Sequence, residues 1–146
     1  MKIISLYGRG NCGKSDTLGL HLRSMILRAL QMPPMAEPIR NKDKDARAVY
    51  DVGGWRVVLC PEGDAEWIVE KNIHYLEQHP SDIVFTSTRT RGVGRERLVA
   101  YARQACIPLT EMAKPYNDGL NPSDQSEANC QLAELLFCNF LTIPEH

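Results

Sequence analysis

Apolar residues follow two different periods along the chain. Short apolar runs, typical of strands buried on both faces, alternate with longer stretches in which apolar residues recur every three or four positions. The runs cover residues 2–7, 55–60, 82–87 and 107–110, and the helical stretches cover residues 16–30, 65–78, 94–106 and 122–140. Strands that alternate with helices predict an α/β fold, with helices on both faces of a mostly parallel sheet.

A second β-rich run, residues 47–52, precedes Gly53-Gly54 and the run 55–60. Two such runs around Gly-Gly predict a hairpin, so residues 47–52 would form an antiparallel strand in a sheet of about five strands. Polar residues without a period predict loops at 35–46 and 114–121. In the helix at 65–78 we expect Trp67 to belong to the buried face.

The 146 residues suit a single domain, spanning 1–146. The formal net charge of -1 makes a nucleic-acid partner unlikely. No apolar stretch has the length of a membrane span, so no membrane partner is expected. The 5 cysteines lack the spacing of zinc ligands, which favours a reduced, cytoplasmic protein.

One segment carries a specific chemical signal. Gly8-Arg9-Gly10-Asn11-Cys12-Gly13-Lys14-Ser15 matches G-x-x-x-x-G-K-[ST], the phosphate-binding loop, and it lies between the first predicted strand and the first predicted helix. Backbone N–H groups of such a loop surround a polyphosphate, with Lys14 on the β- and γ-phosphates and the Ser15 hydroxyl on Mg²⁺. We therefore expect nucleotide binding by the residues at the helix N-terminus and before it: Gly8, Arg9, Gly10, Asn11, Cys12, Gly13, Lys14, Ser15 and Asp16. The alternative is a chance match in a glycine-containing turn.

In these features the first 30 residues resemble the P-loop NTPase superfamily. The resemblance implies a three-layer α/β sandwich that binds ATP or GTP with Mg²⁺ and hydrolyses the nucleotide or transfers a phosphoryl group. Asp51-Val52-Gly53-Gly54 resembles the D-x-x-G element of small GTPases, but no Asn-Lys-x-Asp guanine signature follows it. ATP is therefore favoured, with a GTPase-like switch and a non-catalytic nucleotide-binding or assembly module as alternatives.

The superfamily pattern also requires an acidic residue after a hydrophobic strand, to hold Mg²⁺ directly or through water. Three residues compete for this role: Asp51, Glu62 and Asp64. Cys60 occupies the strand end where aspartate is usual, and the two later acids follow it. Because ligands of such folds bind at the carboxyl ends of the strands, we expect Glu62 and Asp64 to lie at the same edge of the sheet as the phosphate-binding loop, and one of them to assist catalysis. The alternative is that Asp64 caps the helix at 65–78 and Glu62 is solvated.

Four arginines lie within residues 89–97, directly after the strand at 82–87. Arginine stabilises the charge of a transferring phosphoryl group, so Arg89 and Arg91 are predicted to approach the phosphates in the manner of a kinase lid. The alternative is a solvated helix start. A small-molecule phosphate acceptor or a protein partner is compatible with this segment.

Overall fold

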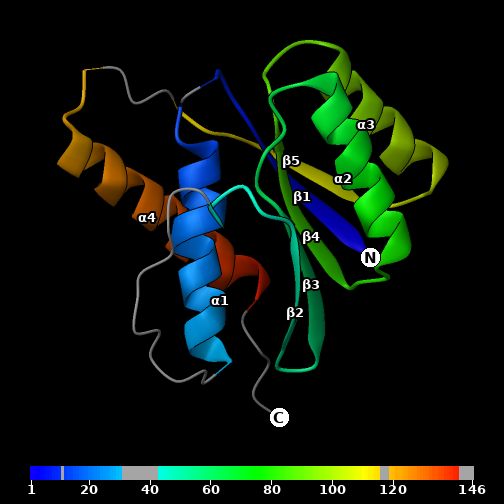
Figure 1. Ribbon diagram of the computed structural model, residues 1–146, viewed down its shortest axis with the longest axis horizontal. Helices are drawn as coiled ribbons and strands as arrows, with labels where there is room; N and C mark the ends of the chain where they lie inside the picture. Colours follow the sequence, from blue (N-terminus) through cyan, green and yellow to red (C-terminus); the bar gives the residue numbers. More distant parts are fainter. Residues whose placement is uncertain (11, 31–42, 116–118, 142–146) are drawn as a thin grey trace.

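The computed structural model describes residues 1–10, 12–30, 43–115 and 119–141. Its centre is a five-stranded sheet in the order β2-β3-β4-β1-β5 (Figure 1). The strands are β1 (Lys2–Tyr7), β2 (Ala48–Val52), β3 (Trp55–Cys60), β4 (Ile83–Thr88) and β5 (Leu109–Ala113). Only β2 is antiparallel to its neighbour in this sheet. The predicted hairpin and the mostly parallel sheet are therefore confirmed.

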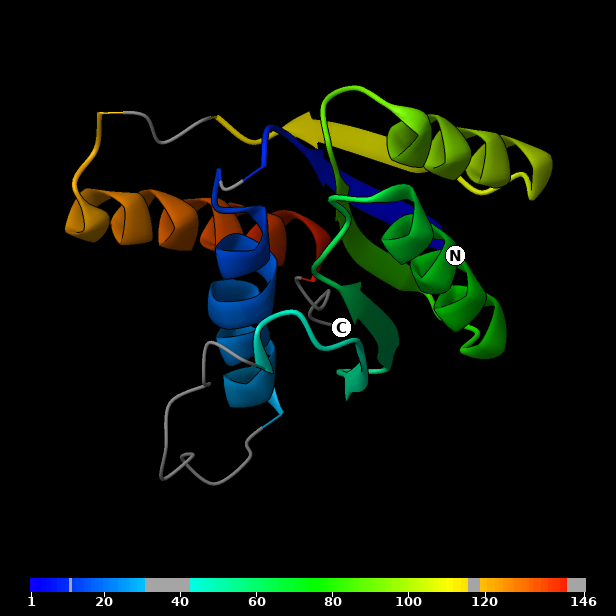
Figure 2. The ribbon, with the colours of Figure 1, turned by 45° about the horizontal axis from the view of Figure 1, so that its top comes forward.

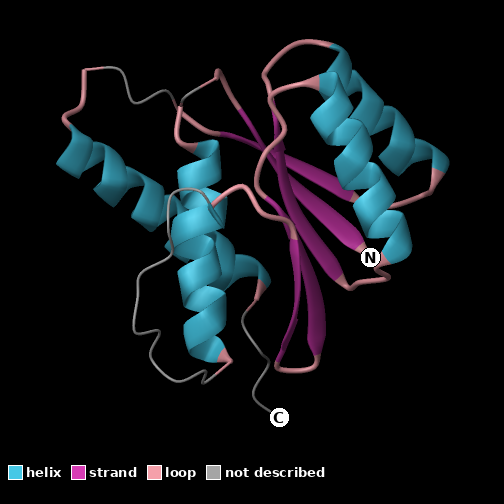
Figure 3. Cartoon of the chain, viewed as in Figure 1, coloured by secondary structure: helices cyan, strands magenta, loops and turns pink. Residues whose placement is uncertain are grey.

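Helices cover both faces of the sheet (Figures 1, 2 and 3). One face carries η1 (Asp16–Leu22), which has the wide winding of a π-helix, its continuation α1 (Arg23–Ala29), and α4 (Pro122–Phe140). The other face carries α2 (Glu66–Gln78) and α3 (Val93–Gln104). The fold is thus α/β, with the sheet between two helical layers.

Alternation along the strands divides the core between the two faces. Ile83 and Phe85 of β4 pack with η1, α1 and α4, whereas Val84 between them packs with α2 and α3. Successive strand side chains point to opposite faces, so a strand covered on both sides must be apolar throughout. This requirement explains why the strands appear in the sequence as continuous apolar runs.

Two details differ from the sequence-based expectations. Trp67 is 62% exposed, because the buried stripe of α2 runs through Ile68, Val69, Asn72, Ile73 and Leu76 instead. The last strand begins at Leu109, two residues later than predicted, because residues 105–107 form the turn that follows the end of α3 at Gln104. Cys106 there has φ 55, and the Ile107 N–H donates to the Ala102 carbonyl.

The start of α4 agrees with the prediction. The Asn121 side chain accepts a hydrogen bond of 2.8 Å from the Asp124 N–H, and Pro122 is the first helical residue. Within the described part of the chain, no helix combines the length and apolar character that crossing a bilayer requires.

Candidate functional site

The phosphate-binding motif lies at the carboxyl end of β1, beside the end of β4. The Gly8 N–H donates to the Thr88 carbonyl at 3.2 Å, and the Thr17 N–H and hydroxyl both donate to the Gly13 carbonyl. Gly13 has φ 99, a conformation that residues with a side chain rarely adopt. The loop therefore enters the helix through a turn that requires glycine. Asn11, the fourth residue of the motif, lies outside the described residues.

Two residues that no local motif in the sequence indicates, Asn129 and Lys114, lie close against this loop. A Cβ atom at Gly13 would lie 2.5 Å from Asn129 Oδ1 of α4, and one at Gly8 would lie 3.0 Å from the Lys114 carbonyl after β5. Burial lowers the pKa of Lys114, and the Cys12 and Asp16 side chains partly oppose that shift. Neither residue belongs to a local motif, so no signal in the sequence pointed to them.

Lys14 turns back across the loop that precedes it. Its Nζ donates to the Gly8 carbonyl at 2.6 Å and to the Arg9 carbonyl at 3.2 Å, and it forms an ion pair of 3.1 Å with Asp64 Oδ1. The side chain of Lys14 is 4% exposed, and that of Asp64 is 37% exposed. A buried ammonium group with oxygen partners on three sides is a position that a phosphate oxygen can share.

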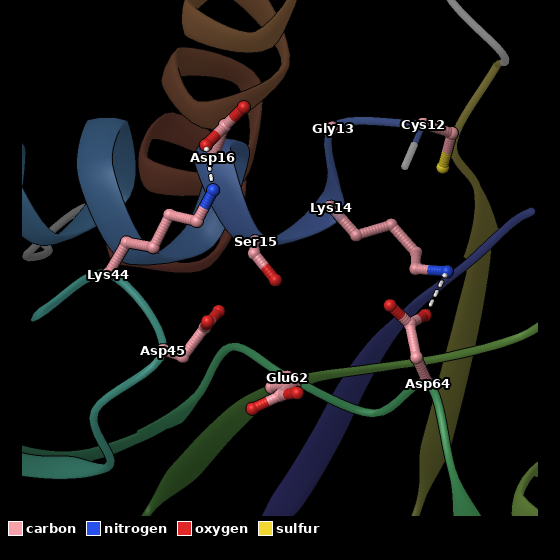
Figure 4. A pocket seen from close by; sticks show the side chains of 9 residues that line it. All are labelled: Cys12, Gly13, Lys14, Ser15, Asp16, Lys44, Asp45, Glu62 and Asp64. Atoms are coloured by element: carbon pink, nitrogen blue, oxygen red, sulfur yellow. Dashed lines mark hydrogen bonds and ion pairs between the residues drawn. The ribbon is translucent and has the colours of Figure 1, made fainter. Parts of the chain in front are cut away.

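A cavity of about 340 Å³ opens beside Lys14 (Figure 4). It is lined by Cys12 to Ser15 of the motif, by Asp16 at the start of η1, and by Lys44, Asp45, Glu62 and Asp64. The carboxyl ends of β1 and β3 thus meet at one edge, as the sequence predicted for Glu62 and Asp64. Asp64 does not cap α2, since the N-cap residue is Ala65 and no side chain caps it. The capping alternative is therefore wrong.

The segment from Pro61 to Asp64 is held by buried side chains from neighbouring elements. The Asn72 amide of α2 donates to the Glu62 carbonyl at 2.7 Å, and the Ser87 hydroxyl donates to the Pro61 carbonyl at 2.7 Å. A Cβ atom at Gly63 would lie 1.6 Å from the Ser87 carbonyl oxygen. Only glycine allows this approach, which brings the segment that carries Glu62 and Asp64 against the backbone of β4.

Asp45 also lines the cavity, together with Asp16, Glu62 and Asp64, and it lies in a segment that the sequence predicts to be a loop. Figure 4 shows Ser15, Asp45 and Glu62 around the same part of the cavity. Asp45 Oδ1 is buried and has no hydrogen-bond partner among the described atoms. Its segment is held against the helix by an ion pair of 3.1 Å between Lys44 and Asp16 and by a hydrogen bond from Arg23 to the Ala46 carbonyl.

The clustered carboxylates alter the acidity of one member. Burial raises the pKa of Glu62, and the negative charges of Asp45 and Asp64 raise it further, against a smaller opposing effect of Arg47. Cys60, at the position where aspartate is usual, is fully buried, and that burial raises its pKa to about 12. The Cys60 thiol is therefore neutral at physiological pH, and the negative charge of this segment comes from Glu62 and Asp64.

We expect Glu62→Gln to stabilise the metal-free protein at neutral pH. Because folding raises the pKa of Glu62 above its usual 4.5, the folded protein disfavours the charged carboxylate. The native chain therefore loses stability as pH rises from 4.5 through the folded-state pKa, and glutamine removes that loss. Urea unfolding measures the free energy at acidic and at neutral pH. Glu77→Gln, an exposed change on α2, should leave the pH dependence unaltered, and an unchanged pH dependence in Glu62→Gln would contradict the prediction.

Asp51, the remaining candidate acid, is remote from this cavity. It lies in β2 next to the Gly53-Gly54 turn, where it pairs with Arg56 near the start of β3, and its side chain is 82% exposed. The carboxyl edge that holds the phosphate-binding motif is the opposite edge of the sheet (Figure 1). A metal role for Asp51 is therefore not supported by its position.

Arg89 and Arg91 line a second, neighbouring cavity of about 260 Å³, to which Asp64 also contributes. A Cβ atom at Gly10 would lie 3.0 Å from the Arg89 guanidinium, so Arg89 contacts the phosphate-binding loop. Arg95 has a structural role instead: it pairs with Glu111 at 2.6 Å, donates to the Thr90 carbonyl and stacks on Tyr7. Arg97 pairs with Glu70.

No group of three or more His, Cys, Asp or Glu side chains in the described residues is arranged to hold a metal by itself. Mg²⁺ does not require such a group, because it commonly keeps several waters and binds one or two carboxylates together with substrate phosphates. Searches for similar proteins returned no matching family model, no matching curated protein and no matching solved structure.

Proposed function

We propose that this chain binds a nucleoside triphosphate with Mg²⁺, ATP in preference to GTP, in the manner of the P-loop NTPase superfamily. The observation that carries the proposal is the position of Gly8 to Gly10 and Cys12 to Ser15 between β1 and the helix, with Lys14 turned across this loop beside a cavity. The sheet between two helical layers is the architecture that the resemblance implies. The remote, exposed position of Asp51 gives no support to the GTPase-like alternative.

In this proposal the loop N–H groups and Lys14 bind the phosphates. The helix N-terminus adds partial positive charge behind them. Lys14 already has oxygen partners, the carbonyls of Gly8 and Arg9 and the carboxylate of Asp64, so phosphate oxygens would meet an ammonium group that is positioned in advance. Arg89, in contact with Gly10, lies where it can stabilise charge on the terminal phosphate.

The residues around the cavity fit a magnesium ion bound with the nucleotide. Hard oxygen ligands are what Mg²⁺ prefers, and the Ser15 hydroxyl, Asp45 and Glu62 supply them. The buried, unpartnered Asp45 Oδ1 and the raised pKa of Glu62 both indicate negative charge that a cation would stabilise. The ion would supply charge neutralisation on the phosphates.

The reaction class that fits these groups is transfer of the terminal phosphoryl group to water or to an acceptor. The attacking oxygen forms a bond to the γ-phosphorus, the bond to the β–γ bridging oxygen breaks, and its electron pair leaves with the nucleoside diphosphate. Asp64 lines both cavities, and in this proposal it would receive the proton of the attacking oxygen.

Calorimetric titration with a nonhydrolysable ATP analogue tests the proposal, in Mg²⁺ and in EDTA. We expect binding that Mg²⁺ strengthens, and we expect Asp45→Asn to reduce that strengthening about tenfold while binding in EDTA is retained or improved. Asp124→Asn, at the exposed start of α4, is the matched control and should bind like the native chain. Absence of nucleotide binding by the native chain in both conditions would overturn the proposed function.

A further inference from the structure

The cavity beside the nucleotide site has a distinct lining. It is bounded by Gly63 to Glu66 at the start of α2 and by Arg89 and the residues from Arg91 to Arg95 at the start of α3. We define these residues as the arginine cavity. Its volume of about 260 Å³ suits a small molecule rather than a second nucleotide. Asp64 is the residue that it shares with the cavity at the phosphate loop.

Two guanidinium groups of the arginine cavity have no partner among the described residues. Arg89 and Arg91 form no ion pair or hydrogen bond with the residues that the structure describes, whereas Arg95 is held by Glu111 and Thr90. An unpaired guanidinium presents a planar fork of donors, which matches the oxygens of a phosphate or carboxylate. The acids of the lining are Asp64, already paired with Lys14, and Glu66.

The backbone contributes positive potential at the same place. α2 and α3 begin side by side: a Cβ atom at Gly94 would lie 3.7 Å from the Glu66 Cα and 3.2 Å from a methyl group of Val69. The N-cap residues of α2 and α3 are Ala65 and Gly92, and neither has a side chain that can accept a hydrogen bond. The first N–H groups of both helices are therefore not capped by a side chain from the N-cap position. The two helix starts add to the charge of Arg89 and Arg91 rather than act alone.

From this combination we infer that the arginine cavity binds a small anionic compound carrying a phosphate or carboxylate group, next to the nucleotide. Arg91 and the helix starts bind its anionic group, and Arg89, which also contacts Gly10 of the phosphate loop, lies between this compound and the nucleotide. The inference deepens the proposed function by naming the class of a second ligand, but binding of the anion does not itself require nucleotide.

Three compounds with the same three-carbon skeleton test the inference: glycerol 3-phosphate, glycerate and neutral glycerol. Each is titrated calorimetrically into the full chain saturated with the Mg²⁺ complex of a nonhydrolysable ATP analogue, so that the phosphate loop is blocked. We expect binding of one or both anions and none of glycerol. The comparison of the two anions decides between a phosphate and a carboxylate. Failure of both anions to bind would overturn the inference.

Matched arginine variants locate the anion. Arg91→Gln should weaken anion binding about tenfold and leave the affinity for the ATP analogue within about twofold. Arg89→Gln should weaken both. Arg103→Gln, the same charge change at the other end of α3, should alter neither. If Arg91→Gln binds the anion as tightly as the native chain does, the anion binds elsewhere and the inference is contradicted.

The proposed nucleotide site and the proposed anion site can be tested separately. Lys14→Ala removes the phosphate-loop charge but no residue of the arginine cavity. The anion titration is therefore repeated on Lys14→Ala without nucleotide. If Lys14→Ala still binds the anion, and adding Arg91→Gln weakens that binding about tenfold, the arginine cavity is supported even if the native chain binds no nucleotide.

Discussion

Replacement of Lys14 by alanine is expected to lower the affinity for Mg²⁺-ATP by about 100-fold. Lys14 is the cation at the centre of the loop, and its Nζ already has oxygen partners on several sides, among them Asp64 at 3.1 Å. Charge-assisted hydrogen bonds are worth about 1.5–3 kcal/mol each, and a factor of 100 corresponds to about 2.8 kcal/mol. Titration of both proteins with a fluorescent ATP analogue measures the difference.

Lys71→Ala is the control for this change. Lys71 is an exposed lysine of α2 that lies over the Trp67 ring, away from the phosphate loop, so its loss should not alter nucleotide affinity. Lys14→Met keeps the length of the side chain without the charge, and it should bind as weakly as Lys14→Ala. Equal affinity of Lys14→Ala and the native chain would contradict the nucleotide site.

Lys14→Ala is also expected to change the protein without nucleotide. It leaves Asp64 without its cation, and Asp64 is one of four carboxylates on the same cavity. Because 37% of the Asp64 side chain is exposed, water can solvate the remaining charge, and the loss of stability should be small beside the loss of affinity. The fall in nucleotide affinity can therefore be measured on a folded protein.

The second large effect is expected from Gly63→Ala, which should lower the free energy of unfolding by about 3 kcal/mol. The added Cβ would lie 1.6 Å from the Ser87 carbonyl oxygen and 2.5 Å from the Ser87 carbonyl carbon. Both sides of this contact are backbone, and the hydrogen bonds of Pro61 with Ser87 and of Glu62 with Asn72 resist separation. Urea unfolding measures the loss.

Gly54→Ala is the control that separates the cost of a steric clash from the cost of a strained backbone. Gly54 has φ 88, but no atom lies within 4 Å of an added Cβ, so only the cost of the strained backbone, about 1 kcal/mol, should appear. Gly63→Ala should also weaken binding of Mg²⁺-ATP, since Glu62 and Asp64 flank the displaced residue, whereas Gly54→Ala should not. A Gly63→Ala protein as stable as Gly54→Ala would show that the two strand ends are not in contact.

Local patterns were sufficient for the elements of this fold. The apolar runs predicted β1, β3 and β4 within one residue at each end, because strands covered on both faces must be apolar throughout. Gly53-Gly54 predicted the hairpin, and Asn121-Pro122 predicted the start of α4. Trp67 was wrongly expected to be buried, because the burial of a residue near a helix end depends on which elements pack against it.

The candidate site was predictable only in part. Gly8 to Ser15 is a local motif whose chemistry depends on the spacing of its residues. Glu62 and Asp64 follow a strand that the apolar pattern identifies, so the sequence predicted that they lie at the same edge of the sheet as the motif. Asp45, Lys114 and Asn129 could not be found in this way. They approach the loop from segments far along the chain, brought there by helix packing and by strand order.

The sequence by itself therefore determined an α/β chain in which a match to the phosphate-binding motif follows the first strand, since both depend on periodicity and spacing within about thirty residues. Tertiary structure alone decided three further features: that Asp64 pairs with Lys14 instead of capping α2, that Asp45 joins the cavity, and that Arg91 lines a second one. Each of these depends on contacts between residues distant in the chain, which strand order and helix packing create and no local pattern encodes.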